Sequence, residues 1–315
     1  MANKGVKNSI LSLSPKIELF VRKLYKNNVK FLAKFNKNKV QVSQLTDFEK
    51  ISTALKTLGV SEGRILVLHS SYEVLEGTGL SPLQVIDKLI SLIGDNGTLV
   101  MNSARRFPEE VKHLNDLDKD YGDEVVTYNV KKSRVWTGTL PFFMLRHKDA
   151  LISKFPINPV VAIGKQAKEM VKDNLTDLGT SCGINSAWKY CVDNDAIVVG
   201  IGIDLTHSLT IIHVAEDMMG DKWPIPNWYR KRKFKIIDVD GTEILTTVKE
   251  RRPIWGSRYF AERTLCKDLL NEGILKSLTV DGVLIEAVDS KVLIEYLNSK
   301  NETGYPYFGI KKFIK

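Results

Sequence analysis

The segments RILVLHSS (residues 64–71), SPLQVIDKLISLIG (81–94) and GTLVMNS (97–103) decide the fold class of this chain. The first and third are short runs of mostly apolar residues, which are typical of buried strands. The second begins with Ser81 as a helix N-cap and Pro82 at the first helical position, and it continues with helical periodicity. Strand, helix and strand in this order predict a parallel pair of strands joined by a right-handed crossover.

The same alternation of helices and strands continues along the rest of the chain. We expect helices at 47–59, 137–149 and 208–219, a strand followed by a helix at 160–174, a strand at 196–202, a β-hairpin at 234–248 around Asp240-Gly241, and helix, strand, helix over 259–300. Residues 105–135 are polar and predict a long surface excursion, over a site. The sequence therefore predicts an α/β class, a layered fold with a central mixed, partly parallel sheet flanked by helices, plus a β-hairpin insertion.

Composition excludes several classes of protein. The 315 residues are 43% hydrophobic and 26% charged, as in ordinary globular proteins. No apolar run approaches the roughly 20 residues of a membrane-spanning helix, and no export signal is evident. The cysteines, Cys182, Cys191 and Cys266, lie far apart, which argues against a disulfide framework and a zinc site. We therefore expect a cytoplasmic protein without a bound metal.

The basic charge is confined to an N-terminal arm. Residues 1–40 hold ten basic residues and one acid, which accounts for the whole net charge of +9. Residues 41–315, expected to form a single domain, carry 36 charges of each sign, so nucleic-acid binding is not expected. Within the arm, apolar residues at helical spacing predict a basic amphipathic helix: Ile17, Phe20, Leu24, Phe31 and Phe35. This helix either contacts a membrane surface weakly or packs on the body or on a neighbouring subunit.

Two predicted strands end in polar residues. LVLHSSYEVLEGTG (66–79) places small hydroxyls and glycines where α/β sheets bind ligands, although it matches neither standard nucleotide-binding fingerprint. AIVVGIGIDLTHSLTIIHVAED (196–217) ends in a polar cluster in which His213 and Glu216 share a helix face. This pair suits general acid–base chemistry, and the alternative is a structural histidine.

Two further interpretations of the polar residues remain open. A metal site formed by Asp204, His207 and His213 is a weak alternative, because it lacks a recognised ligand spacing. Cys182, in a glycine-containing loop, is either a nucleophile or a buried, inert thiol.

Taken in order, these stretches resemble the aminoglycoside 3-N-acetyltransferase family over residues 47–295. The landmarks are LVLHSS with GTG, VIDKLISLIGDNGTLVM, GTLPFFMLR, FPINPVVAIGKQA, GTSCGINSAW, AIVVGIG and TIIHVAE. The resemblance implies direct acyl transfer from acyl-coenzyme A to an amino-sugar amine, with no metal. It places Ser70, Ser71, Gly77 and Gly79 at coenzyme A. It also gives Thr210, His213 and Glu216 catalytic roles, with His213 as general base, although a later acid such as Glu250 could be its partner.

The chain departs from the family pattern around the expected acceptor. The loop before Thr210 is longer than usual, which places Asp204 and His207 there as candidate acceptor-binding residues, and Asn102 and Ser103 replace a common Pro-Thr. These departures favour an N-acyltransferase that acts on a nucleotide-linked amino sugar for surface polysaccharide biosynthesis. One alternative is aminoglycoside acetylation conferring antibiotic resistance. Another is a non-enzymatic membrane-surface or scaffold protein. Homo-oligomerisation is left open, and the enzyme hypothesis predicts that the body without its arm stays active.

Overall fold

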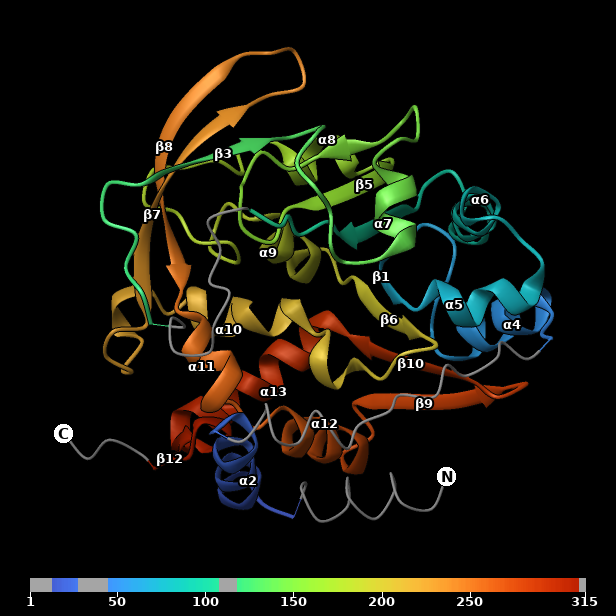
Figure 1. Ribbon diagram of the computed structural model, residues 1–315. Coiled ribbons are helices and arrows are strands. Elements are labelled where there is room, and N and C mark those ends of the chain that lie inside the picture. The colour runs from blue at the N-terminus through green and yellow to red at the C-terminus, as the bar shows by residue number, and fades with distance from the viewer. Residues whose placement is uncertain (1–12, 28–44, 108–117, 312–315) are drawn as a thin grey trace.

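The structure, a computed structural model, describes residues 13–27, 45–107 and 118–311. Its centre is a seven-stranded sheet with the order β4-β5-β2-β1-β6-β10-β9 (Figure 1). The strands of this sheet are β1 (Ile65–Ser70), β2 (Thr98–Asn102), β4 (Leu151–Ile152), β5 (Val160–Gly164), β6 (Ile197–Ile201), β9 (Leu275–Val280) and β10 (Val283–Asp289).

The three middle strands of the sheet, β2, β1 and β6, run parallel, whereas their outer neighbours are antiparallel. Ile65 of β1 lies opposite Thr98 of β2, and Leu66 lies opposite Ile197 of β6. Every residue of β2 and β6 is buried, as expected for strands covered on both faces. The predicted strand–helix–strand unit and the layered fold with a mixed sheet are confirmed.

Helices cover both faces of this sheet (Figure 1). The α-helices are α2 (Pro15–Asn27), α4 (Phe48–Thr57), α5 (Tyr72–Leu75), α6 (Pro82–Ile93), α7 (Thr139–Met144), α8 (Ala167–Val171), α9 (Ala187–Asp193), α10 (His213–Asp217), α11 (Pro253–Arg258), α12 (Glu262–Asn271) and α13 (Ser290–Thr303). The 3-10 helices are η2 (Glu76–Thr78), η4 (Leu205–His207), η5 (Thr210–Ile212), η6 (Gly220–Lys222) and η7 (Pro306–Phe308).

The alternation of side chains along β1 shows how the two faces are filled. Leu66 and Leu68 pack into the cluster formed with α4, α6 and α7, whereas Ile65 and Val67 belong to the cluster formed with α8, α9, α12 and α13. α6 begins as predicted, because the Ser81 hydroxyl accepts a hydrogen bond from the backbone N–H of Gln84 in a capping box. Sheet alternation and helix caps thus fix this part of the core locally.

A second sheet stands apart from the first, with the order β3-β7-β8. Its strands are β3 (Val125–Asn129), β7 (Tyr229–Ile237) and β8 (Glu243–Arg251). The β7–β8 pair is the predicted hairpin, whose tip is at the top of Figure 1, and β3 pairs with β7. The predicted surface excursion of residues 105–135 therefore contains a strand. The signal was the alternation of Val126 and Tyr128, which are buried, with more exposed neighbours.

Two other expectations differ from the structure. The predicted helix at 208–219 is split into η5 and α10, so it starts with a tighter turn. The prediction of a single strand between the last two long helices was wrong. Two strands, β9 and β10, form an antiparallel hairpin there. Asp281 and Gly282 turn it with φ values of 47° and 81°, the positive angles that a two-residue hairpin turn requires. A small sheet of β11 (Gly304–Tyr305) and β12 (Ile310–Lys311) follows α13.

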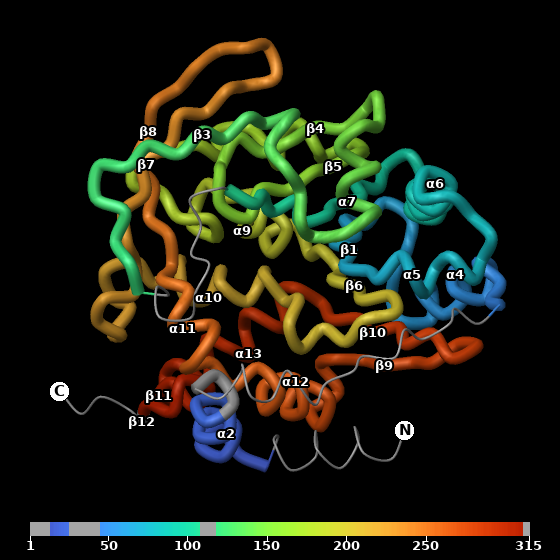
Figure 2. Tube along the Cα trace, viewed as in Figure 1, coloured from blue at the N-terminus to red at the C-terminus, as the bar shows by residue number. Residues whose placement is uncertain are grey.

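The described part of the arm is α2, which lies against α11 and α12 (Figure 2). The helix was predicted, but its docked face is polar: Glu18 is buried, whereas Ile17, Phe20 and Leu24 are exposed. Phe31 and Phe35 lie outside the described residues, and the arm's membrane contact stays a prediction. Within the described ranges, no helix is long and apolar enough to cross a membrane.

Candidate active site

The carboxyl ends of three parallel strands meet at one edge of the large sheet. β1 ends at Ser70, β2 at Asn102 and β6 at Ile201, and adjacent parallel strands place such ends together. A cavity of ≈ 560 Å³ opens there. Its wall includes Ser70 and Asn102 from the strand ends, and Thr210 and His213 from the segment after β6.

A second cavity, of ≈ 420 Å³, adjoins the first. The two share the lining residues Ala104, Trp136, Asn158, His213 and Arg251. The remaining wall of the second cavity comes partly from the β7–β8 hairpin, through Arg232 and Glu250. His213 therefore stands where the two cavities meet, so ligands in both would lie against one imidazole.

His213 and Glu216 form the pair that the sequence predicted. Nδ1 of His213 lies 2.9 Å from Oε2 of Glu216. When Nδ1–H is donated to the carboxylate, the neutral imidazole has its lone pair on Nε2. Nε2 has no hydrogen-bond partner among residues 13–27, 45–107 and 118–311, and the side chain is 15% exposed. His213 can therefore accept a proton at Nε2.

The surroundings of Glu216 keep it ionised. Burial by itself raises the pKa of this carboxyl, but the charges of His213 and Arg251 and the bond from His213 outweigh it and lower the pKa below its ordinary value. Arg251 Nη1 lies 3.6 Å from Oε2 of Glu216. Glu250, the other acid considered as a partner for His213, instead pairs with Arg230 and Arg232. The partner of His213 is therefore Glu216.

The hydroxyl of Thr210 is oriented by a neighbouring amide. Asn102 Nδ2 donates a hydrogen bond of 3.1 Å to Thr210 Oγ1, and Asn102 Oδ1 accepts one from the backbone N–H of Ala104. Because the Thr210 oxygen accepts from Asn102, its hydrogen can be donated elsewhere. Thr210 lines the cavity at the strand ends, so it can donate to an oxyanion there. Asn102 was noticed in the sequence only as a departure from the family pattern.

The four residues expected at coenzyme A take different positions. Ser70 lines the larger cavity, and Ser71 is the N-cap residue of α5, where its side chain makes no capping hydrogen bond. Gly77 is buried and Gly79 has a φ of 72°, and neither lines either cavity. His69, which the sequence analysis did not single out, lines the larger cavity, and burial lowers the pKa of its imidazole to about 4. The coenzyme A assignment stays a prediction.

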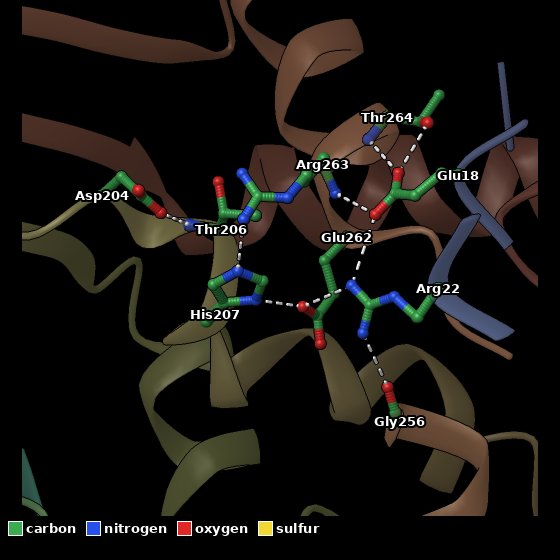
Figure 3. A network of polar contacts seen from close by, with 9 residues as sticks. All are labelled: Glu18, Arg22, Asp204, Thr206, His207, Gly256, Glu262, Arg263 and Thr264. Atoms are coloured by element: carbon green, nitrogen blue, oxygen red, sulfur yellow. Dashed lines mark hydrogen bonds and ion pairs between the residues drawn. The ribbon is translucent and has the colours of Figure 1, made fainter. Parts of the chain in front are cut away.

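His207 and Asp204 belong to a network of polar contacts that includes Thr206, Glu262 and Arg263 (Figure 3). Nδ1 of His207 contacts Oε2 of Glu262, and Nε2 accepts a hydrogen bond of 3.2 Å from Arg263. Asp204 accepts one from the backbone N–H of Thr206. His207 still lines the larger cavity, whereas Asp204 does not. Among the residues that the structure describes, no three His, Cys, Asp or Glu side chains lie together in a way that could hold a metal ion.

Cys182 is a buried thiol rather than an activated one. Its pKa is raised well above the ordinary value, first by burial and then by the charge of Asp217. Asp217 itself accepts hydrogen bonds from the backbone N–H of Cys182, at 2.9 Å, and from the hydroxyl of Tyr229, at 2.5 Å. Burial raises the pKa of Asp217 too. The inert interpretation of Cys182 is the one that these surroundings favour.

Arginines of the second cavity were missed in the sequence analysis. Arg105, Arg232 and Arg251 all line it. The signal was available in YRKRKFKII (residues 229–237), because alternation places Arg230 and Arg232 on the face that also carries Phe234 and Ile236. All four are buried. Arginines are rarely buried unless they are paired, so this pattern in a strand predicts a buried counter-charge or ligand.

Comparison with known proteins gives consistent matches. A family model described as aminoglycoside 3-N-acetyltransferase matches residues 67–300. Aminoglycoside N(3)-acetyltransferase IV of Salmonella sp. is 27% identical over 172 residues, 55% of this chain. The match spans 59% of that relative's length.

Solved structures match over most of their length. Aminoglycoside acetyltransferase AAC(3)-IIb superposes with a TM-score of 0.65 at 21% identity, covering 84% of this chain and 99% of that one. The binary complex of AAC-IIIb with CoASH gives 0.64 at 19%, covering 82% and 96%. A variant of AAC(3)-IVa in complex with a gentamicin gives 0.63 at 19%, covering 84% and 91%. At this identity the likeness establishes the fold.

Proposed function

The chain belongs to the aminoglycoside 3-N-acetyltransferase family, and from this premise we propose that it transfers an acetyl or other acyl group from acyl-coenzyme A to the amine of an amino-sugar acceptor. The observation that carries the proposal is His213, whose Nδ1 is bound to Glu216 and whose Nε2 is open where two cavities meet. One cavity would hold the thioester and the other the acceptor.

His213 acts as the general base. Its Nε2 takes a proton from the amine as the amine nitrogen attacks the thioester carbonyl. The new N–C bond replaces the C–S bond, and the His213 imidazolium returns the proton to the sulfur, so coenzyme A leaves as the thiol. Glu216 holds the neutral tautomer before the transfer and stabilises the imidazolium afterwards, as a carboxylate does in other His-dependent acyl transfers.

The hydroxyl of Thr210 stabilises the negative charge that develops on the carbonyl oxygen. Asn102 orients this hydroxyl, so the donor is positioned before the reaction begins. Attack is direct and needs no acyl-enzyme, which agrees with the raised pKa of the buried Cys182 thiol. Ser70, at the end of β1, would contact coenzyme A in the same cavity.

Aminoglycosides are the acceptors that the comparisons favour. Proteins of the same fold are described as bound to a gentamicin and to sisomicin, and the family model and the Salmonella relative name the same activity. On this proposal the protein acetylates an aminoglycoside amine and confers resistance. This acceptor class accounts for the sequence landmarks that the chain shares with the family.

The second candidate acceptor is a nucleotide-linked amino sugar of surface polysaccharide biosynthesis. Aminoglycosides are polycations, which need carboxylates free to pair with ammonium groups. Among the described residues lining the second cavity, the carboxylates are Asp217 and Glu250, and both already have protein partners. This observation favours an acceptor with less positive charge.

Calorimetric titration with coenzyme A tests the proposal first. We expect a micromolar Kd, about 8 kcal/mol of binding free energy; no heat and no thermal stabilisation at millimolar coenzyme A would contradict it. Thiol release from acetyl-coenzyme A is then measured with kanamycin, gentamicin and nucleotide-linked amino sugars. Turnover of the drugs supports the first acceptor class, and turnover of nucleotide-linked sugars alone supports the second. Cys182→Ala is the control and should retain activity.

A further inference from the structure

The second cavity has buried arginines in its wall. Arg230 and Arg232 lie two residues apart on the inner face of β7, and their side chains are each 2% exposed. Arg232 lines the cavity itself. Burying a guanidinium is costly unless a counter-charge and hydrogen-bond acceptors compensate it. The partners of these arginines therefore indicate whether the protein compensates their charges or leaves room for an anionic ligand.

One carboxylate serves both arginines. Glu250 accepts from Nε of Arg230 at 2.6 Å and from Nη1 of Arg232 at 3.2 Å. Nε and Nη2 of Arg232 are buried without a hydrogen-bond partner in the described part of the chain. Aromatic rings face the guanidinium instead, with Tyr121 at 4.4 Å and Phe234 at 4.9 Å from Cζ. Glu250 therefore compensates only one of the two guanidinium charges. The other carboxylate among the described residues of the cavity wall, Asp217, already accepts hydrogen bonds from Cys182 and Tyr229.

Two more arginines add to the uncompensated positive charge. Arg105 is 3% exposed and uses both terminal nitrogens on backbone carbonyls, those of Ser133 and Val130, and no carboxylate among the described residues pairs with it. Arg251, whose side chain is 23% exposed, lines both cavities and lies 3.6 Å from Glu216, which already pairs with His213. Positive charge therefore extends from the cavity wall to the reacting imidazole.

We propose that the second cavity binds an anionic group of the acceptor, a phosphate or diphosphate ester, against Arg232 and Arg251. The inference rests on the proposed function, since it specifies the acceptor of the same site. An anion there would supply the missing counter-charge, and arginine binds phosphate oxygens through paired N–H groups. The acceptor is then a phosphorylated amino sugar, whose anion is held in the cavity while its amine faces His213.

The experiment separates this site from the coenzyme A phosphates. The protein is first saturated with coenzyme A and is then titrated with inorganic pyrophosphate, with uridine diphosphate and with glucuronate. Pyrophosphate or uridine diphosphate should still bind, and Arg232→Met and Arg251→Met should each weaken binding about tenfold, or roughly 1.4 kcal/mol. Lys231→Ala removes the same charge from the outer face of β7, where Lys231 is exposed, and should leave binding unchanged.

The titrations distinguish the sources of the anion. Tighter binding of uridine diphosphate than of pyrophosphate assigns the site to a nucleotide-linked sugar, and equal binding assigns it to a simple sugar phosphate. A preference for glucuronate would overturn the phosphate assignment. So would loss of all anion binding once coenzyme A is bound, or equal weakening in Lys231→Ala. Should Arg232→Met fail to fold, Arg251→Met carries the same comparison.

Failure of the proposed function has a different signature. A protein that binds no coenzyme A is not the proposed transferase. A protein that binds coenzyme A and acetylates kanamycin, while pyrophosphate neither binds nor inhibits, keeps the proposed function and refutes only the anion site.

Discussion

Two histidines six residues apart, His213 and His207, each pair with a glutamate, yet only one of them has a ring nitrogen open to accept a proton. In the first, His213 pairs with Glu216 inside one short helix and its Nε2 stays open. In the second, His207 pairs with Glu262 of α12, which is distant in sequence, and Arg263 donates to its Nε2 (Figure 3). Both histidines line the larger cavity.

The difference shows that a histidine near a carboxylate is a base only if its other nitrogen is free. In the second pair, both nitrogens of His207 are engaged, so accepting a substrate proton at Nε2 would displace Arg263. We therefore propose that His207 forms part of the wall of the larger cavity, where it could contact the acceptor, and does not act as the base. α2 belongs to the same network, because Arg22 bonds to Glu262 and to Glu18, which in turn accepts from the first turn of α12.

Replacing each histidine should produce the largest contrast. His213→Ala removes the base and should lower kcat by about 10²–10⁴-fold, while the affinity for coenzyme A is retained. His207→Ala should lower kcat less than about tenfold and act mainly on KM. Steady-state thiol release and calorimetry measure both effects. Equal losses of kcat in the two variants would remove the distinction between the pairs.

Replacing the carboxylate tests the first pair more finely. Glu216→Gln keeps the size of the side chain but removes the charge that stabilises the imidazolium. A hydrogen bond to a charged group is worth about 1.5–3 kcal/mol, so kcat should fall roughly ten- to hundredfold. The matched change Glu262→Gln should leave kcat within about threefold. A Glu216→Gln enzyme with full activity would show that the carboxylate only holds the ring.

The arm supports the second pair, and its removal should cost stability. The Glu18 carboxylate accepts from the backbone N–H groups of Arg263 and Thr264 at 3.0 and 2.7 Å, which supplies the cap that Ala261 cannot. Glu18→Ala should lower the free energy of unfolding by about 1–3 kcal/mol. Urea denaturation measures this loss.

Lys16→Ala, on the exposed face of the same helix, is the control for Glu18 and should change stability by less than about 0.5 kcal/mol. Deleting residues 1–40 should destabilise the body in the same way as Glu18→Ala. A truncated protein as stable as the full chain would show that the docking of α2 does not stabilise the body.

The smallest effect is a dependence of stability on pH. Burial raises the pKa of Glu262, but the bond from His207 and the charge of Arg22 outweigh it, so the net shift is downward from 4.5. A carboxyl with a lowered folded pKa stabilises the protein above its unfolded value and loses that contribution as pH falls through the folded value. The stability difference between wild type and Glu262→Gln should therefore shrink below about pH 4.5. A difference that stays constant on acidification would contradict the pairing.

Much of the fold was predictable because its signals are local. The buried strand at 65–70, the capped helix beginning at Ser81 and the Asp240-Gly241 hairpin each follow from residues close in sequence. β3 was missed because it lies inside an otherwise polar stretch, and β9 because most of its residues are exposed. The pairing of both strands depends on a partner strand. Strand order also depends on such partners, so the position of β6 beside β1 was not available from sequence.

In the candidate site, too, contacts between residues close in sequence were predictable and contacts between distant residues were not. The spacing of His213 and Glu216 brings them together on one helix, and the sequence was sufficient for that pair. Asn102 against Thr210 spans 108 residues, and Glu18 against Thr264 spans 246. No spacing rule connects such residues. The arginines of β7 lie between these cases, since alternation indicates their face but not the cavity that the face lines.

The sequence by itself determined that His213 and Glu216 share one side of a helix, because the helical period fixes the direction in which side chains three residues apart project. Only the tertiary structure decided which of two histidines keeps a nitrogen open, what Glu250 pairs with, and which face of α2 is buried. Those outcomes depend on contacts between distant segments, where the need to compensate each buried charge selects one partner among many.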